Sequence, residues 1–131
     1  MKYVPLLLAA ALTTPALAAP SPAPPPVLGD FSCLVRTMYI AGAAEETANK
    51  ATDAASRENA MNVSTEAYEA ASYFIGRLTT TKGTAVTKAR FDAEVASLAK
   101  LGDSALSGQI AQCTTRAKTE RAAFITPFAG K

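Results

Sequence analysis

Cysteine and histidine decide which chemistry this chain can perform. Of its 131 residues two are cysteines, Cys33 and Cys113, and none is histidine. We expect the cysteines to form one disulfide, because the N-terminus resembles an export signal and exported chains fold in oxidising compartments. A disulfide leaves no thiol nucleophile, the lack of histidine excludes the usual hydrolytic triad, and two cysteines are too few ligands for structural zinc. We therefore predict no catalytic, cofactor-binding or metal-binding residues.

Carboxylate pairs are the remaining candidates for acid–base chemistry. The chain offers Glu45 with Glu46, and Glu66 with Glu69. Both pairs lie among polar residues that we expect to face solvent, where nothing should shift their pKa values. The protein is therefore predicted not to be an enzyme. A small carboxylate-dependent enzyme is kept as a third hypothesis.

Several cationic and aromatic residues could instead contact a partner. The candidates are Tyr73, Arg77, Arg116, Lys118 and Arg121. Arg77 could present its guanidinium to an anionic ligand, but a solvated or internally paired arginine is favoured. Glu120 lies four residues after Arg116 and would offset an anion-binding surface, which favours a solvated helix face there.

The N-terminus has the pattern of a secretory signal. Lys2 gives a positive start, residues 4 to 12 are apolar, and Ala16 and Ala18 supply the small residues of a cleavage site after Ala18. The apolar run is too short to span a bilayer, and no later stretch is long enough. We expect an exported protein, periplasmic or secreted, without a transmembrane segment.

The mature chain is expected to divide into three parts. Residues 19 to 27 are rich in proline and predict a disordered linker, with a ligand for a proline-reading domain as the less favoured alternative. Residues 28 to 126 form one helical domain, and residues 127 to 131 form a flexible tail. Loss of Lys2 with the signal leaves 12 of the 13 basic residues against 11 acidic ones, a net charge of +1. This balance argues against a nucleic-acid partner.

Residues 30 to 44 predict a helix that begins near Phe31, with Asp30 capping its first turn. Two adjacent apolar stripes indicate burial on more than one side. One stripe comprises Phe31, Leu34, Val35, Met38, Ala41 and Gly42, and the other Cys33, Thr37, Ile40 and Ala44.

A second helix is predicted to follow an exposed loop. The polar, alanine-rich residues 45 to 62 contain that loop, which passes into the helix between Thr52 and Ser64, and the helix ends near Thr79. Gly76 interrupts its densest apolar segment and costs about 1 kcal/mol of helix propensity relative to alanine. We therefore expect another helix to approach Gly76 closely, so that Gly76→Leu would destabilise the domain by overpacking.

Two shorter patterns predict a third and a fourth helix. Thr87 is expected to cap the third and Gly102 to end it, and Asp103 or Ser104 to cap the fourth. The apolar faces are Phe91, Val95 and Leu98 in the third, and Leu106, Ile110, Cys113, Ala117 and Phe124 in the fourth.

Four helices, short connections and no alternating strand pattern predict an all-α fold, a small four-helix bundle-like domain with one disulfide. Alanine-rich helices contribute little apolar area each, so the core must depend on few large side chains. We expect these to be Leu34, Val35, Met38, Phe74, Ile75, Leu78, Phe91, Val95, Leu98, Leu106 and Ile110.

Three features of the chain resemble a group of uncharacterised small exported proteins of alphaproteobacteria. They are residues 30 to 39, the segment Tyr73-Phe74-Ile75-Gly76-Arg77-Leu78 and a late second cysteine. The resemblance covers most of the mature chain and implies export but no particular activity. An exported helical domain of this size with one disulfide is more distantly similar to the small periplasmic acid-stress chaperones, which implies a chaperone function by analogy.

The leading functional hypothesis is a non-enzymatic, exported binding or interaction module for a protein or small ligand. The second is an acid-activated periplasmic holdase. Without histidine the fold should be indifferent to pH between about 5 and 8, whereas below about pH 4 neutralised carboxylates leave a self-repelling positive charge. The disulfide would keep the loosened chain compact while Phe74, Ile75 and Phe91 became exposed to unfolded clients.

Overall fold

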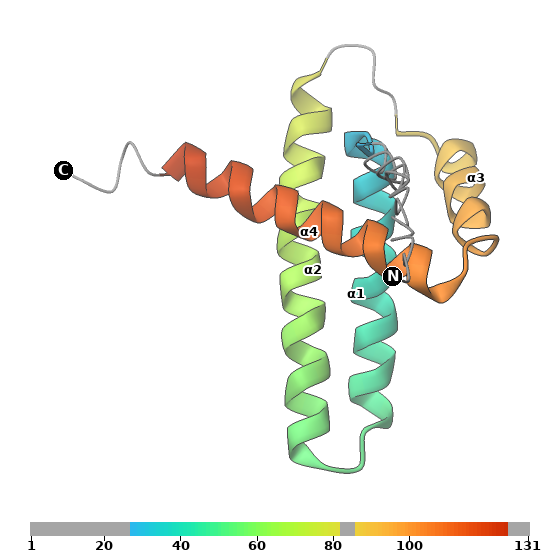
Figure 1. Cartoon of the computed structure of the whole chain (residues 1–131), viewed down its shortest axis with the longest axis vertical. Coiled ribbons are helices and arrows are strands. Elements are labelled where there is room, and N and C mark those ends of the chain that lie inside the picture. The colour runs from blue at the N-terminus through green and yellow to red at the C-terminus, as the bar shows by residue number, and fades with distance from the viewer. Residues whose placement is uncertain (1–26, 82–85, 126–131) are drawn as a thin grey trace, which may run out of the picture.

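The computed structural model of the chain describes residues 27 to 81 and 86 to 125 (Figure 1). The predicted signal, the predicted tail and all of the predicted linker except Val27 lie outside the described residues. Four helices follow one another: α1 (Asp30–Lys50), α2 (Ala54–Thr80), α3 (Lys88–Leu98) and α4 (Asp103–Ile125). No strand occurs in either described range, and Cys33 is bonded to Cys113. The predicted all-α, bundle-like fold with one disulfide is confirmed.

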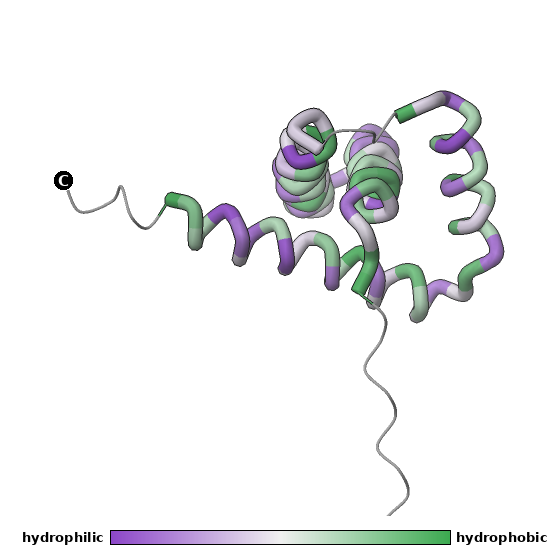
Figure 2. The backbone as a smooth tube through the Cα atoms, turned by 90° about the horizontal axis from the view of Figure 1, so that it is seen from above, coloured by the Kyte–Doolittle hydropathy of each residue, from purple (hydrophilic) through white to green (hydrophobic). Residues whose placement is uncertain are grey.

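The helices form a hairpin crossed by a third helix and flanked by a fourth. α1 and α2 run antiparallel and share the largest interface in the molecule (Figure 1). Figure 2 views this pair end-on, with α4 lying across one face of it and α3 standing beside α1. α4 contacts both helices of the hairpin, whereas the main contact of α3 is with α1.

Polar caps start two of the helices. The side chain of Thr87 accepts a hydrogen bond from the Arg90 amide at 3.2 Å, which confirms the predicted cap of α3. Asp53 does the same for the Ser56 amide at 2.7 Å and begins α2. This second cap was not predicted, because residue 53 was expected to lie inside a loop.

The loop predicted within residues 45 to 62 is much shorter than expected. α1 continues to Lys50, and only residues 51 to 53 separate it from α2. The prediction was wrong because it equated few large apolar groups with an exposed loop. Alanines in this segment instead pack the two helices together, and alanine is the best helix former.

Two glycines occupy different positions from those predicted. Gly29, not Asp30, is the capping residue of α1, and its carbonyl accepts from the Cys33 amide at 2.9 Å. Gly102 does not end α3, which stops at Leu98, but directly precedes α4 and accepts from the Leu106 amide at 3.0 Å. Asp103 therefore lies in the first turn of α4 and is not its cap.

The main core lies where α4 crosses the hairpin. Its buried members are Phe31, Cys33, Leu34, Val35, Ala70, Ala71, Phe74, Leu78, Leu98, Cys113 and Ala117. Three further residues of the predicted core, Phe91, Val95 and Leu106, pack against it while only partly buried, and Ile110 is half-buried.

Two members of the predicted core, and one residue of the predicted apolar face of α4, are exposed instead. Met38 is 39% exposed and Ile75 is 46% exposed, because α3 stands beside α1 and leaves part of the hairpin uncovered. Phe124 is 74% exposed, because the last turns of α4 project beyond α2 (Figure 1).

The end of the hairpin remote from α4 is packed through small side chains. Ala41, Ala44 and Ala48 are buried on α1, where their spacing places them on one face. Ala60, Ser64 and Ala67 are the buried residues of the opposing part of α2. Small side chains let the helix axes approach closely, but each removes little apolar area from water.

Gly76 should tolerate a side chain, contrary to the prediction made from the sequence. A Cβ atom added to Gly76 meets nothing within 4 Å, and the residue is exposed inside α2. No helix approaches it. Gly76→Ala should therefore raise the free energy of unfolding by about 0.5 to 1 kcal/mol, measured by urea denaturation. Gly102→Ala is the control, since it lies outside a helix interior, and a loss of stability in Gly76→Ala would contradict the open environment.

Candidate functional site

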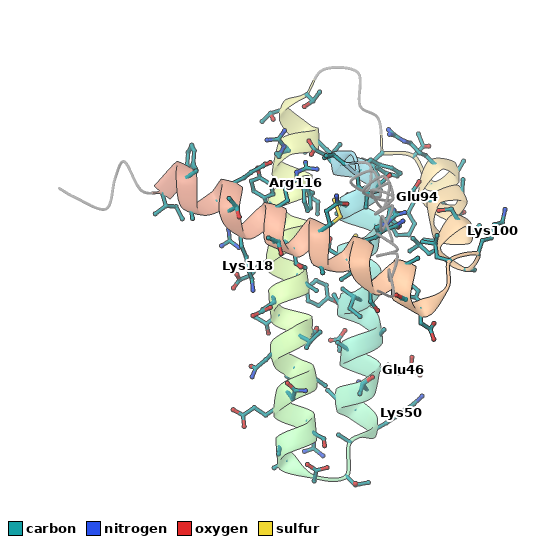
Figure 3. The ribbon with its side chains drawn as sticks, in the orientation of Figure 1. Glu46, Lys50, Glu94, Lys100, Arg116 and Lys118 are labelled. Carbon is teal, nitrogen blue, oxygen red and sulfur yellow. A yellow bond between two sulfur atoms is a disulfide. The ribbon has the colours of Figure 1, made fainter. Side chains whose placement is uncertain are left out.

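Three of the residues singled out in the sequence meet where α4 crosses α1 and α2. Tyr73, Arg77 and Arg116 surround the carboxylates of Asp30 and Glu120, and we call these five residues the junction cluster. Figure 3 shows Arg116 at this crossing. The cluster joins the first turn of α1, the last turns of α2 and the middle of α4.

The junction cluster is internally neutralised. Arg77 Nε lies 2.8 Å from Asp30 Oδ2, and Arg77 Nη1 lies 3.2 Å from Glu120 Oε2. Arg116 pairs with the other Asp30 oxygen, and its Nε lies 3.2 Å from Glu120 Oε1. The Tyr73 hydroxyl donates to Glu120, and this bond, with the charges of Arg116 and Arg77, lowers the pKa of Glu120. The favoured interpretation of Arg77 as internally paired is confirmed.

The other two candidate cations pair with the candidate carboxylates of α2. Lys118 Nζ lies 3.0 Å from Glu66 Oε2, and Arg121 Nη1 lies 3.0 Å from Glu69 Oε2. Lys118 lies against α2 in Figure 3. All four side chains are well exposed, so these pairs stabilise the crossing only weakly.

Glu45 and Glu46 also contact polar side chains. The Tyr68 hydroxyl donates to Glu45 Oε2 at 3.2 Å, and Glu46 pairs with Lys50 at 2.5 Å. The hydrogen bond from Lys50 lowers the pKa of Glu46. The expectation that nothing shifts the pKa values of these carboxylates was therefore wrong for Glu46, because a lysine stands four residues later on the same helix face.

A buried arginine that the sequence analysis did not single out joins three helices. The Arg36 side chain is 6% exposed, and its Nη1 lies 2.6 Å from Glu94 Oε1 of α3. Its Nε donates to Gln109 Oε1 of α4 at 2.7 Å, and Nη1 also donates to the Ser32 carbonyl at 3.0 Å. Glu94 lies between α3 and α1 in Figure 3. In the sequence, the only sign of this role is that Arg36 is a charged residue among the apolar residues of a helix expected to be buried.

An apolar groove opens between the hairpin and α3. It has a volume of about 490 Å³, and we call it the apolar groove. Its lining residues are Leu34, Met38, Ile75, Leu78, Thr79, Val86 and Phe91. Met38 and Ile75, expected in the core, form part of its wall. The groove was not predicted, because apolar periodicity indicates which face of a helix is apolar but not whether another helix covers that face.

A second hollow lies on the other side of Met38 and Phe91. It has a volume of about 430 Å³ and is lined by Val35, Met38, Tyr39, Gly42, Ala43, Glu46, Phe91 and Val95. α3 therefore rests on α1 along a ridge with open space on both sides.

Within residues 27 to 81 and 86 to 125, no three or more acidic, cysteine or histidine residues are grouped so as to hold a metal ion. In the same ranges no helix is long and apolar enough to cross a bilayer.

Comparisons with known proteins assign no family to this geometry. No protein-family model matches the chain, and no curated protein or solved structure matches it.

Removal of the Glu94 charge should destabilise the domain at neutral pH but not in strong acid. Hydrogen bonding to Arg36 lowers the pKa of Glu94, so the ion pair contributes fully above about pH 4.5 and is lost as the pH falls through the folded pKa. Glu94→Gln leaves a buried guanidinium without its anion, and we expect a loss of about 1 to 3 kcal/mol at pH 7. At pH 2 the parent and the variant should unfold at similar urea concentrations.

Glu46→Gln is the matched control for this prediction. The pKa of Glu46 is also lowered by a cation, but the pair with Lys50 is exposed to water. Its removal should change the stability little at either pH. Equal losses from both variants would contradict a structural role for the Arg36–Glu94 pair.

Proposed function

We propose that the protein is a non-enzymatic, exported binding module that holds an apolar ligand in the apolar groove. The groove itself is the observation that carries this proposal. Its volume lies within the range of about 300 to 1,000 Å³ typical of small-molecule sites. Thr79 is the one polar residue among the described residues that line it, so most of the binding free energy would come from burial of apolar surface.

The partial exposure of the groove wall supports the same function. Met38 and Ile75 are large side chains that remain in contact with water although they adjoin the core. A ligand that covered them would remove apolar area worth about 25 cal/mol per Å². α1 and α2 supply one rigid wall, and α3 supplies the other through Phe91.

Export is supported by the disulfide. A bond between Cys33 and Cys113 persists in oxidising compartments such as the periplasm or the cell exterior. The signal pattern that ends at Ala18 lies outside the described residues, and it supports the same localisation.

A charge placed in the groove should abolish binding of an uncharged apolar dye. Phenylnaphthylamine fluoresces strongly in apolar sites, and we expect it to bind the parent and to lose at least about tenfold in affinity in Ile75→Glu, because a carboxylate would have to be desolvated. Val63→Glu is the matched control, since Val63 is exposed on α2 to a similar degree and lies outside the groove. No dye binding by the parent, or equal losses in both variants, would contradict the proposal.

An acid-activated holdase is a second candidate, and the Arg36–Glu94 pair favours it. α3 buries only Leu98 among its described residues, so this pair is a principal tie between α3 and α1. Arg36 lowers the pKa of Glu94 below its ordinary value of 4.5, and protonation of Glu94 as the pH falls through that lowered pKa would release the tie. Outward movement of α3 would then expose Leu34 and Phe91, which line the groove. Phe74 is fully buried beneath the helix crossing and Ile75 is already exposed, so these two residues are not the surface that acid would uncover.

The holdase should suppress aggregation of an acid-unfolded client at pH 2 to 3 but not at pH 7, as measured by light scattering. Glu94→Gln should act at a higher pH than the parent, because its tie is already absent, whereas Glu46→Gln should follow the parent. Client aggregation that the oxidised parent leaves unchanged in acid would exclude this candidate.

A further inference from the structure

A more polar hollow adjoins one end of the apolar groove. It has a volume of about 240 Å³, and Asp30, Phe31, Leu78, Thr81 and Arg90 are among the residues that line it. Leu78 lines both spaces, and Arg90 directly precedes Phe91 of the groove wall. An apolar surface of small-ligand size therefore ends beside a cation.

Arg90 is held in place without being neutralised. Its guanidinium carbon lies 4.0 Å from the centre of the Phe31 ring, a stacking distance at which the ring face attracts the cation. Arg36, Arg77, Arg116 and Arg121 all form salt bridges, whereas Arg90 forms none with a described carboxylate. A stacked guanidinium keeps its N–H groups at the ring edge, where they can bind both oxygens of a carboxylate.

Three described acidic groups that share the hollow or the helix of Arg90 are bound by other cations. Asp30, which lines the same hollow, pairs with Arg77 and Arg116. Glu94, four residues after Arg90 on α3, pairs with Arg36. Asp92 pairs with Lys88 on α3. Among the described cations that line this hollow or pair with these carboxylates, Arg90 is therefore the one without a salt bridge, although its charge also contributes to the lowered pKa of Glu94.

We infer that the ligand of the apolar groove is a free fatty acid, with its alkyl chain along the groove and its carboxylate on Arg90. The inference rests on the proposed binding function and specifies its ligand. One groove of this volume accommodates a single chain, and one unpaired guanidinium beside its end matches a single carboxylate. Thr81 also lines this hollow, but its hydroxyl donates to the Arg77 carbonyl at 2.9 Å, so Arg90 supplies the donors for the carboxylate.

The test compares two ligands that differ only in the head group. Dodecanoate and dodecanol are titrated at pH 7, below their aggregation concentrations, as competitors of bound phenylnaphthylamine. The parent should bind dodecanoate about tenfold more tightly than dodecanol, since a charge-assisted hydrogen bond has that order of strength. Arg90→Gln should lose this tenfold for dodecanoate and leave dodecanol unchanged.

Two variants make the outcome specific. Ile75→Glu should weaken both ligands, and Arg57→Gln should weaken neither, because Arg57 is an exposed arginine at the far end of the hairpin that pairs with no described carboxylate. Dodecanol and dodecanoate binding equally to the parent would overturn the inference while leaving the groove as a binding site. A parent that binds neither ligand nor the dye would overturn the proposed function as well. Displacement of the dye by an amphipathic helical peptide but by neither ligand would identify a protein partner and also overturn the inference.

Discussion

The bond between Cys33 and Cys113 holds α4 across the α1–α2 hairpin. The buried residues of α4 are Cys113 and the small Ala117, so apolar burial alone holds this helix weakly. Closing a loop of 80 residues reduces the conformational entropy of the unfolded chain. This reduction stabilises the folded state by at most about 4.5 kcal/mol, which is comparable with the whole stability of a small domain. The junction cluster adds charged pairs that link α4 to the first turn of α1 and the last turns of α2.

The same shortage of large side chains explains the groove. Because α4 covers one face of the hairpin, α3 alone is left to cover the part of the hairpin beside α1, and its eleven residues bury little. Met38 of α1 and Phe91 of α3 line the open spaces on both sides of this contact, and the buried Arg36 ties α3 to α1. A larger side chain in α3 would close the space that we assign to the ligand. The small apolar burial of α3 and the proposed binding site thus have the same cause.

Local chemistry in the sequence predicted part of this arrangement. The cysteine pair, the Thr87 cap and the buried side of α1 around Leu34 and Val35 follow from residue type and period. The exposure of Met38 and Ile75 could not be predicted in this way, because both follow apolar periodicity and only the position of α3 leaves them uncovered. The junction cluster is equally non-local, since Asp30 is separated from Arg116 by 86 positions, and its proximity depends on the crossing angle of α4.

The alanine-packed end of the hairpin has a consequence for how the molecule moves. Contacts there involve Ala41, Ala44 and Ala48 of α1 against small residues of α2, and α4 crosses the hairpin elsewhere. Separating these helix ends would therefore expose little apolar area and would break neither the disulfide nor the junction cluster. The backbone amides of this end would exchange with solvent deuterium through local openings of low free energy, while those near Cys33 would exchange only when the whole domain unfolds. The disulfide would thus keep the helix crossing rigid, while the alanine-packed end of the hairpin opens more readily.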